Sequence, residues 1–210
     1  MLIDLIVLGG AVSWVIIVFG VLAFIVFIER SLNLHRARIG TEDFLKGVFN
    51  ILDRGNVREA LAICEDTPGP AAYVTRTAIQ HRNDSLPMLQ QALADAEEGE
   101  ISRMERRLVV IATVGQIAPL LGLLGTVLGI IEVALVVNLQ APLVQAGDVM
   151  PGVLRALIST ATGLSVAIPC YAAFNLLVIK IDRIVLDMQR ARRDMVAYMS
   201  RWLGGSVTDA

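Results

Sequence analysis

This sequence has only two cysteines and two histidines, and it has no excess of positive charge. The two cysteines, Cys64 in a charged segment and Cys170 in an apolar one, do not suggest a disulfide framework. The two histidines, His35 and His81, have no ligand-like spacing to the cysteines, so no metal ion or other cofactor is expected. A net charge of −2 gives no basic surface for nucleic acid. No Ser-His-Asp arrangement is suggested, and an enzyme is not expected.

Charged residues are also few, and three long stretches lack them altogether. Charged residues are 18 % of the chain and hydrophobic residues 55 %. A soluble domain has about a quarter charged and about 45–50 % apolar residues. The charge-free runs are Leu5–Ile28, Leu108–Ile131 and Ala156–Ile179, each 24 residues long. About 20 apolar residues let a helix cross ~30 Å of hydrocarbon, so we predict an all-α membrane protein with three transmembrane helices.

The three runs divide the chain into six segments. The first run has no basic region before it and is too long for the apolar core of a signal peptide, so we expect it to be retained. We predict transmembrane helices at residues 1–28, 108–137 and 154–179, a charged helical insert at 29–107 that continues into the second of them, a short hairpin at 138–153, and a helical tail at 180–210.

Lysine and arginine fall almost entirely on one side of this arrangement. With three spans, 17 of the 18 basic residues lie in the insert and the tail, and Arg155 is the exception. An excess of basic residues marks the cytoplasmic side of a membrane protein. We therefore predict that the insert and the C-terminus are cytoplasmic, and that the N-terminus and the hairpin lie outside.

Helix signals in the insert and the tail predict a collar of helices. Thr41 is a candidate cap for an amphipathic stretch that breaks at 53–56, and 67–70 is a second break. Residues 83–85 offer another cap, from which one helix is expected to continue through the second span. The tail is expected to stay helical until Gly204–Gly205 stops it. The two long helices would pack antiparallel, as a structural collar or, alternatively, as a docking surface for a regulator.

Small residues line one face of both the second and the third span. Steps of three and four residues place them on one side of a helix, which is typical of close helix packing in membranes. The glycines lie inside a span and do not follow a strand, so they do not form a phosphate-binding loop. The second span carries Gly115, Ala118, Gly122, Gly125 and Gly129, and the third carries Ala156, Thr160, Gly163, Ala167 and Cys170.

Two threonines at these faces, Thr126 and Thr160, admit two interpretations. A threonine in an apolar helix often bonds the backbone of its own helix four residues back. Alternatively, the two hydroxyls line a polar path, since a hydroxyl both donates and accepts hydrogen bonds. A proton path needs an ionisable group near the bilayer centre, and the three runs contain none. If the chain conducts an ion, H⁺ or Na⁺, a partner is expected to supply the acid.

Two long motifs lie in the second and third spans, namely Gln116–Ile130 and Pro151–Pro169, the latter followed by Asn175. They resemble the second-span and third-span signatures of the ExbB/TolQ/MotA proton-channel family, and of its ExbB/TolQ branch in particular. The order of the spans, the insert and the short hairpin match as well, so the resemblance covers essentially the whole chain.

The resemblance implies a bacterial inner-membrane homopentamer around a dimer of an ExbD- or TolR-like single-span partner, whose aspartate carries the proton. It also implies that work is delivered through the periplasm to a TonB- or TolA-like protein. Matched by motif, Thr126 and Thr160 correspond to pore-lining threonines. Pro119 and Pro169 correspond to prolines that kink the spans or open backbone carbonyls. The N-terminus would be periplasmic and the C-terminus cytoplasmic.

Arg155 departs from the motif, because many ExbB and TolQ sequences have a glutamate there. Helical rise places Glu132 about 9 Å outward from Thr126, and Arg155 about 7.5 Å outward from Thr160. If the two threonines share a depth, the two charges lie within ~2 Å of one depth, which predicts an ion pair at the outer mouth of the path. The alternative is that each side chain snorkels separately to water.

Two other functions compete with an ion-driven motor. A non-conducting membrane scaffold or assembly subunit would use the same small-residue faces to assemble. A small-solute transporter is disfavoured, because the spans are few and no inverted repeat is evident.

Overall fold

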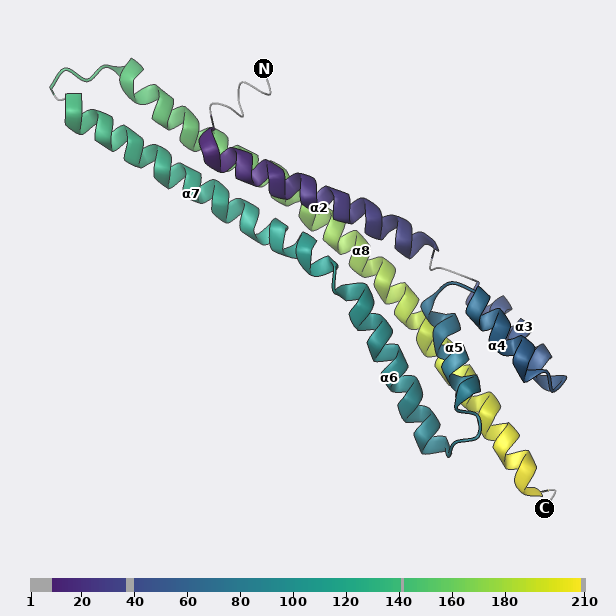
Figure 1. Ribbon diagram of the computed structural model, residues 1–210. Coiled ribbons are helices and arrows are strands. Elements are labelled where there is room, and N and C mark those ends of the chain that lie inside the picture. The colour runs from purple at the N-terminus through teal and green to yellow at the C-terminus, as the bar shows by residue number, and fades with distance from the viewer. Residues whose placement is uncertain (1–8, 37–39, 141, 209–210) are drawn as a thin grey trace. The chain divides into compact units, whose positions relative to one another are not determined.

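The computed structural model describes residues 9–36, 40–140 and 142–208, and these residues form helices without a strand (Figure 1). The all-α class predicted from the apolar runs is therefore confirmed. In chain order the helices are α2 (Gly10–Arg36), α3 (Thr41–Asp53), α4 (Val57–Asp66), α5 (Pro70–Gln80), α6 (Leu86–Glu105), α7 (Leu108–Gln140) and α8 (Ala146–Thr208).

Three helical stretches are long and apolar enough to cross a membrane. They are Gly10–Leu34, Leu86–Gln140 and Ala146–Arg201. Large apolar side chains on these stretches point outward, and Leu120 on α7 and Ile168 on α8 are 64 % and 67 % exposed. A helix hydrogen-bonds its own backbone and can present such a surface to lipid. The chain is an all-α membrane protein.

Residue contacts divide the described chain into two compact units. The first comprises the described residues up to Glu29 together with Arg107–Leu176, and we call it the apolar unit. The second comprises Arg30–Arg106 and the described residues from Leu177 onward, and we call it the charged unit. Helices α2 and α8 contribute to both units.

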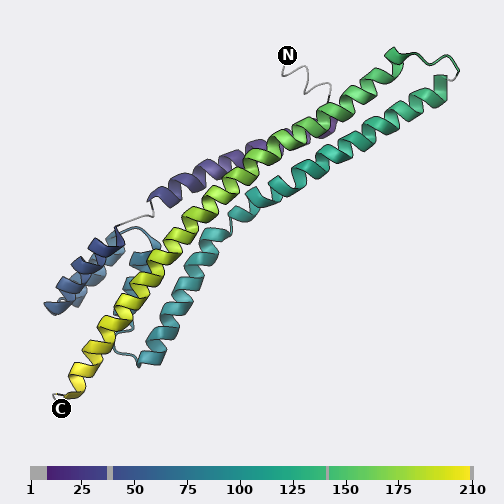
Figure 2. The ribbon, with the colours of Figure 1, turned by 180° about the vertical axis from the view of Figure 1, so that it is seen from behind.

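In the apolar unit, α7 and the first part of α8 lie side by side, and α2 packs against them (Figures 1 and 2). One buried residue from each helix forms a small core, namely Ile16, Ala118 and Ala167. Two of the three are alanines, so the helices approach closely with little side-chain volume between them. The apolar residues packed around this core are Val12, Leu121 and Val166.

In the charged unit, α3 to α6 pack each on the next and surround the second part of α8. Figure 2 shows α6 and this part of α8 running antiparallel, as predicted. Arg192 on α8 and Glu97 on α6 form an ion pair at 3.2 Å. The face of α8 turned into this unit is apolar and buried, with Ile181, Ile184, Met188, Met195 and Met199.

The two helix breaks predicted in the insert are both present. Helix α3 ends at Asp53 and α4 begins at Val57, with Gly55 at φ +76° between them. Gly69 precedes α5 and has a φ of +130°. Both are conformations that glycine adopts without the steric penalty of a Cβ.

Two caps differ from the prediction. Gly40 occupies the N-cap position of α3, and Thr41 is the first helical residue with its side chain buried. Ser85 occupies the N-cap position of α6 as predicted, but no side-chain hydrogen bond is made there within the described chain. At Thr41 the local cap preference gives way to burial of the side chain, which propensity does not report.

The predicted continuous helix through the second span is wrong in detail, because a turn at Arg106–Arg107 separates α6 from α7. Arg107 forms an ion pair with Glu29 of α2, and this tertiary contact outweighs local helix preference. The predicted stop at Gly204–Gly205 is also wrong, since α8 continues to Thr208. A glycine costs about 1 kcal/mol in a helix relative to alanine, which weakens the helix without ending it.

Candidate functional site

The two helices α7 and α8 meet along a seam at which their backbones nearly touch. A Cβ atom added at Gly122 would lie 3.2 Å from the Cα atom of Thr160. A Cβ atom added at Gly163 would lie 2.7 Å from the carbonyl oxygen of Ala118. Real Cβ atoms do not approach other atoms as closely as at Gly163, and the approach at Gly122 is tighter than most, so close packing favours glycine at both positions.

The seam continues toward the hairpin with the same chemistry. A Cβ atom added at Gly129 would lie 2.7 Å from the carbonyl oxygen of Gly152 and 2.8 Å from the Cβ atom of Ala156. One added at Gly125 would overlap the hydroxyl and the Cβ atom of Ser159. The small residues of the second span that the sequence analysis placed on one face are all buried here, namely Gly115, Ala118, Gly122, Gly125 and Gly129.

The two candidate threonines lie on facing helices next to this seam. The Thr160 hydroxyl of α8 donates a hydrogen bond to the Gly122 carbonyl of α7 at 3.3 Å. The Thr126 hydroxyl donates to the Leu123 carbonyl of its own helix at 2.5 Å. In a regular helix the Gly122 carbonyl also accepts the N–H of Thr126. One carbonyl group therefore links the two threonines.

Other hydroxyls of the third span behave differently from Thr160. Thr162 donates to the Ile158 carbonyl at 2.8 Å, and Ser165 donates to the Ala161 carbonyl at 2.7 Å. These are bonds within one helix, four residues back. Thr160 bonds across the seam instead, whereas Thr126 bonds within its own helix. That the two hydroxyls line a polar path stays a prediction.

Ser159 is a seam residue that is absent from the small residues named for the third span in the sequence analysis. It is fully buried, whereas Thr160 is only partly buried. Its hydroxyl has no hydrogen-bond partner within residues 9–36, 40–140 and 142–208. Residue 159 lies three residues after Ala156 and four before Gly163, and residue 160 lies four after and three before. Both spacings fit one helix face, so periodicity alone does not choose between the two residues.

Glu132 and Arg155 lie together at the hairpin end of the seam. The Arg155 Nη1 atom donates to the Glu132 Oε2 atom at 2.6 Å, and the two side chains are 44 % and 39 % exposed. Arg155 also lies against α2, since a Cβ atom added at Gly10 would be 3.3 Å from its Nε atom. Gly10 has a φ of +72°, a further reason for glycine at this position. The location of the pair at the outer mouth of an ion path stays a prediction.

The prolines of the two spans lie inside unbroken helices. Pro119 is within α7 and Pro169 within α8. Proline has no N–H, so the carbonyl group four residues earlier has no helical donor. These carbonyl groups belong to Gly115 and Ser165. The kinks expected at the prolines stay a prediction. The two carbonyl groups are available as backbone hydrogen-bond acceptors.

Groups that could hold a metal ion were sought among histidine, cysteine, aspartate and glutamate, and none occurs in the part of the chain that the structure describes. The chemistry of the seam is therefore that of hydroxyls, backbone carbonyls and one ion pair. Such groups can hydrogen-bond a proton donor or coordinate a small cation, and they cannot themselves carry charge through hydrocarbon.

The family follows from the segment that contains this seam. Residues 67–190, more than half of the chain, match the model of the MotA/TolQ/ExbB proton channel family. The chain belongs to this family. The match includes α5 to α7 and most of α8, and hence both threonines, both prolines and the glycines of the seam. The resemblance found in the two span motifs is confirmed.

Several relatives carry names from the ExbB/TolQ branch of the family. The biopolymer transport protein ExbB of Aquifex aeolicus is 42 % identical over 86 residues, which are 41 % of this chain and 57 % of that protein. TolQ of the Tol-Pal system of Haemophilus influenzae is 37 % identical over 97 residues, 46 % of this chain and 42 % of that protein. An ExbB homologue of Methanothermobacter thermautotrophicus is 28 % identical over 177 residues, 83 % of this chain and 62 % of that protein. The chain spans less than two thirds of the length of these relatives.

Proposed function

We propose that this chain is the ion-path subunit of an ion-driven motor or stator in the bacterial inner membrane. In this proposal it couples the proton motive force, through an ExbD- or TolR-like single-span partner, to work on a TonB- or TolA-like protein that spans the periplasm. The observation that carries the proposal is the Thr160 hydroxyl bonded across the seam to Gly122, beside Thr126, in a charge-free region. Membership of the family supports it.

The partner is required because this chain lacks an acid where one is needed. The charge-free runs of α7 and α8 contain no ionisable carboxylate, and a hydroxyl cannot carry a proton as a stable charge. A carboxylate on a partner helix, placed against Thr126 and Thr160, would accept the proton and release it on the other side. The assembly we propose is a homopentamer of this chain around a partner dimer.

The other site residues take supporting roles in this proposal. Pro119 and Pro169 free two carbonyl groups that can solvate the ion. Glu132 and Arg155 hold the outer mouth together through their 2.6 Å ion pair. The glycines of the seam keep α7 and α8 close, so that the threonines of both helices face one path. No resident cofactor is needed, since the transported ion is the substrate.

The test is ion flux through the assembled complex in proteoliposomes, with the single-span protein encoded beside this chain co-expressed. Thr160→Ala is expected to lower proton uptake about tenfold or more, the loss that follows from removing one well-placed hydrogen-bonding group. Thr160→Ser keeps the hydroxyl and is expected to keep most of the flux. Thr162→Ala is the matched control, because Thr162 bonds within its own helix.

Assembly must be measured on the same samples. Native mass spectrometry of the solubilised complex is expected to show five copies of this chain with two of the partner, unchanged by Thr160→Ala. A Na⁺ gradient in place of the pH gradient tests which ion is used. A monomer or dimer that does not bind the partner in a mild detergent would contradict the proposed pentameric assembly.

A non-conducting scaffold is the second candidate, favoured by how tightly the seam packs. On this view Thr160→Ala changes neither flux nor function, whereas enlarging a seam glycine abolishes assembly. The two candidates thus make opposite predictions for the same threonine variant.

A further inference from the structure

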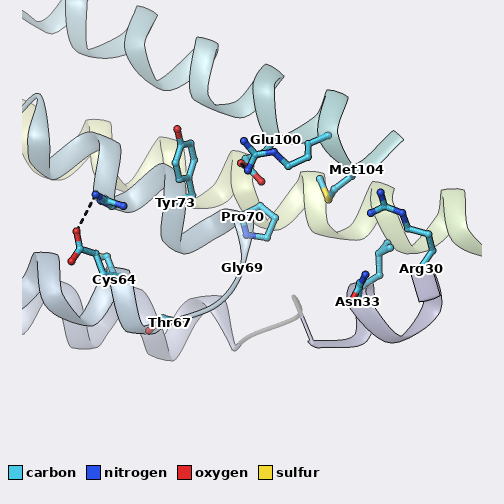
Figure 3. Close-up of a pocket in the computed structure, with 13 residues that line it drawn as sticks. Arg30, Asn33, Cys64, Thr67, Gly69, Pro70, Tyr73, Glu100 and Met104 are labelled. Atoms are coloured by element: carbon cyan, nitrogen blue, oxygen red, sulfur yellow. Dashed lines mark hydrogen bonds and ion pairs between the residues drawn. The ribbon is translucent and has the colours of Figure 1, made fainter. Parts of the chain in front are cut away.

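A pocket of about 390 Å³ opens in the charged unit, where α2, α4, α5 and α6 meet (Figure 3). Three arginines line it, Arg30 from α2, Arg76 from α5 and Arg103 from α6. Two glutamates, Glu65 and Glu100, line it as well. The pocket therefore carries an excess of positive charge, in a chain whose net charge is −2.

The guanidinium groups retain donors beyond their ion pairs. Arg76 contacts Glu65 through Nη2 at 2.9 Å, and Arg103 contacts Glu100 through Nη1 at 2.9 Å. A guanidinium has five N–H donors, so one ion pair leaves most of them available. The Nε atom of Arg76 is buried and has no hydrogen-bond partner among the residues that the structure describes. A buried donor of this kind calls for an acceptor.

The N-terminal end of α5 borders the same pocket. Gly69 at its N-cap and Pro70 in its first turn both line the pocket, and Figure 3 shows them beside Tyr73 and Glu100. No side-chain cap hydrogen bond is made here in the described chain, and the first turn has no acidic residue. The nearby Thr67 hydroxyl donates to the Ile63 carbonyl instead. The positive end of the α5 helix dipole favours an anion at this position.

The Cys64 thiol in this pocket adds no negative charge. Burial raises the pKa of Cys64 from 9 to about 11, so the thiol is protonated near neutral pH. An anion in the pocket would compete with the two glutamates, Glu65 paired with Arg76 and Glu100 paired with Arg103.

We propose that this pocket binds a phosphate group, held by the forks of Arg76 and Arg103 and by Arg30, at the positive end of the α5 helix dipole. Phosphate oxygens match guanidinium geometry and helix N-termini. Arg30 lies two residues beyond the first charge-free run on the same helix, about 3 Å along its axis. That position is the level of lipid headgroups, so the phosphate belongs either to an anionic lipid or to a free phosphate ion or ester.

The experiment uses the full chain in a neutral detergent and follows its thermal unfolding. Inorganic phosphate is titrated against chloride at matched ionic strength, and in a second arm short-chain phosphatidylglycerol is compared with phosphatidylcholine. Phosphate or phosphatidylglycerol is expected to raise the Tm, with saturation. Arg76→Gln and Arg103→Gln are each expected to raise the apparent Kd about tenfold.

Arg58→Gln is the matched control, because Arg58 is exposed on α4 and does not line the pocket. It should bind within about twofold of the unchanged chain. If Arg76→Gln fails to fold, Arg103→Gln decides, since its side chain is 76 % exposed and its loss leaves no buried gap. A Tm rise with the lipid alone assigns the phosphate to a headgroup. No saturable rise in either arm, or an equal loss in Arg58→Gln, overturns the proposal.

Discussion

At Gly125 the close packing of α7 against α8 requires a residue without a Cβ atom. A Cβ atom there would overlap Ser159 on the facing helix, while the Ser159 hydroxyl itself lacks a partner. The same position thus combines tight packing with an unsatisfied polar atom. A buried unsatisfied group costs about 1–3 kcal/mol, so this part of the apolar unit is close-packed without being optimally stable.

We predict that Gly125→Ala destabilises the chain by about 1–3 kcal/mol, the usual cost of overpacking a tight contact. The measurement is unfolding of the purified chain in detergent, followed by circular dichroism. Adding Ser159→Gly to this variant removes the overlapping side chain and should recover part of the loss.

Gly99→Ala provides the comparison. Gly99 lies in α6 with open space around it, so the added methyl group should stabilise by about 0.5–1 kcal/mol through helix propensity. If Gly125→Ala is as stable as Gly99→Ala, the α7–α8 contact accommodates a methyl group at little cost, which would contradict the prediction.

A second prediction at this scale concerns the pair of Glu132 and Arg155. Reversing one charge places like charges together, so Glu132→Arg and Arg155→Glu are each expected to lower the Tm and the ion flux. The double reversal restores attraction and should recover both. Because the side chains are 39 % and 44 % exposed, the stability effect should stay within about 1 kcal/mol. If the double variant has no higher Tm or ion flux than either single variant, the ion pair contributes to neither.

Among the helices, the sequence predicted best where spacing and backbone sterics decide. The small residues at steps of three and four in α7 are the buried ones, and the breaks at Gly55 and Gly69 coincide with positive φ. Spacing placed Thr160 on this face but passed over Ser159, because steps of three and four residues from Ala156 to Gly163 can include either position. It also failed at Arg107, whose ion pair with the distant Glu29 leaves no trace in local pattern.

The pocket of the charged unit shows the same limit. Arg30, Arg76 and Arg103 are ordinary solvated charges when the sequence is inspected, and they come from three different helices. Only the packing of those helices brings the arginines together. The threonines were found because a motif marked them, but the bond of Thr160 to Gly122 required the structure.

The contact between α3 and α8 yields a prediction at the scale of elements. The Tyr198 ring stacks on Phe49 at 4.8 Å between centroids, and its hydroxyl donates to the Asp53 carboxylate at 2.7 Å. Burial, followed by the hydrogen bond to Asp53, raises the pKa of Tyr198 from 10 to about 12. The folded chain thus favours the protonated phenol.

The sign of the pH dependence follows from this pKa. Below pH 10 the phenol is protonated in both states and the contact contributes fully; between pH 10 and 12 the unfolded chain ionises first, so the stabilisation is progressively lost. Tyr198→Phe should lack this part of the decline and lose about 1 kcal/mol at neutral pH. Unfolding curves of both proteins across this range are the measurement. Parallel curves would contradict the prediction.

For the whole molecule, the distribution of basic residues sets the expected orientation. Seventeen of the 18 lie in the insert and the tail, and the positive-inside rule places these segments in the cytoplasm. The hairpin between α7 and α8 is then outside. Leu143 in this hairpin is 84 % exposed, which makes it a suitable reporter position.

We predict that Leu143→Cys is labelled by a membrane-impermeant maleimide on intact cells whose outer envelope has been opened. Arg58→Cys, exposed on α4, should be labelled only after the inner membrane is permeabilised. Both variants are made in a chain with Cys64→Ser and Cys170→Ala, so that each carries one thiol. The opposite labelling pattern would reverse the orientation.

The backbone contact between α7 and α8 also has a genetic consequence. Every amino acid other than glycine has a Cβ atom, so every missense mutation at Gly125 or Gly129 adds volume where none fits. Leu120, turned away from the seam, can be exchanged for other apolar residues without this penalty. Under selection, the codons of these two glycines are therefore expected to accumulate synonymous changes almost alone, while the codon of Leu120 also accepts changes to other apolar residues.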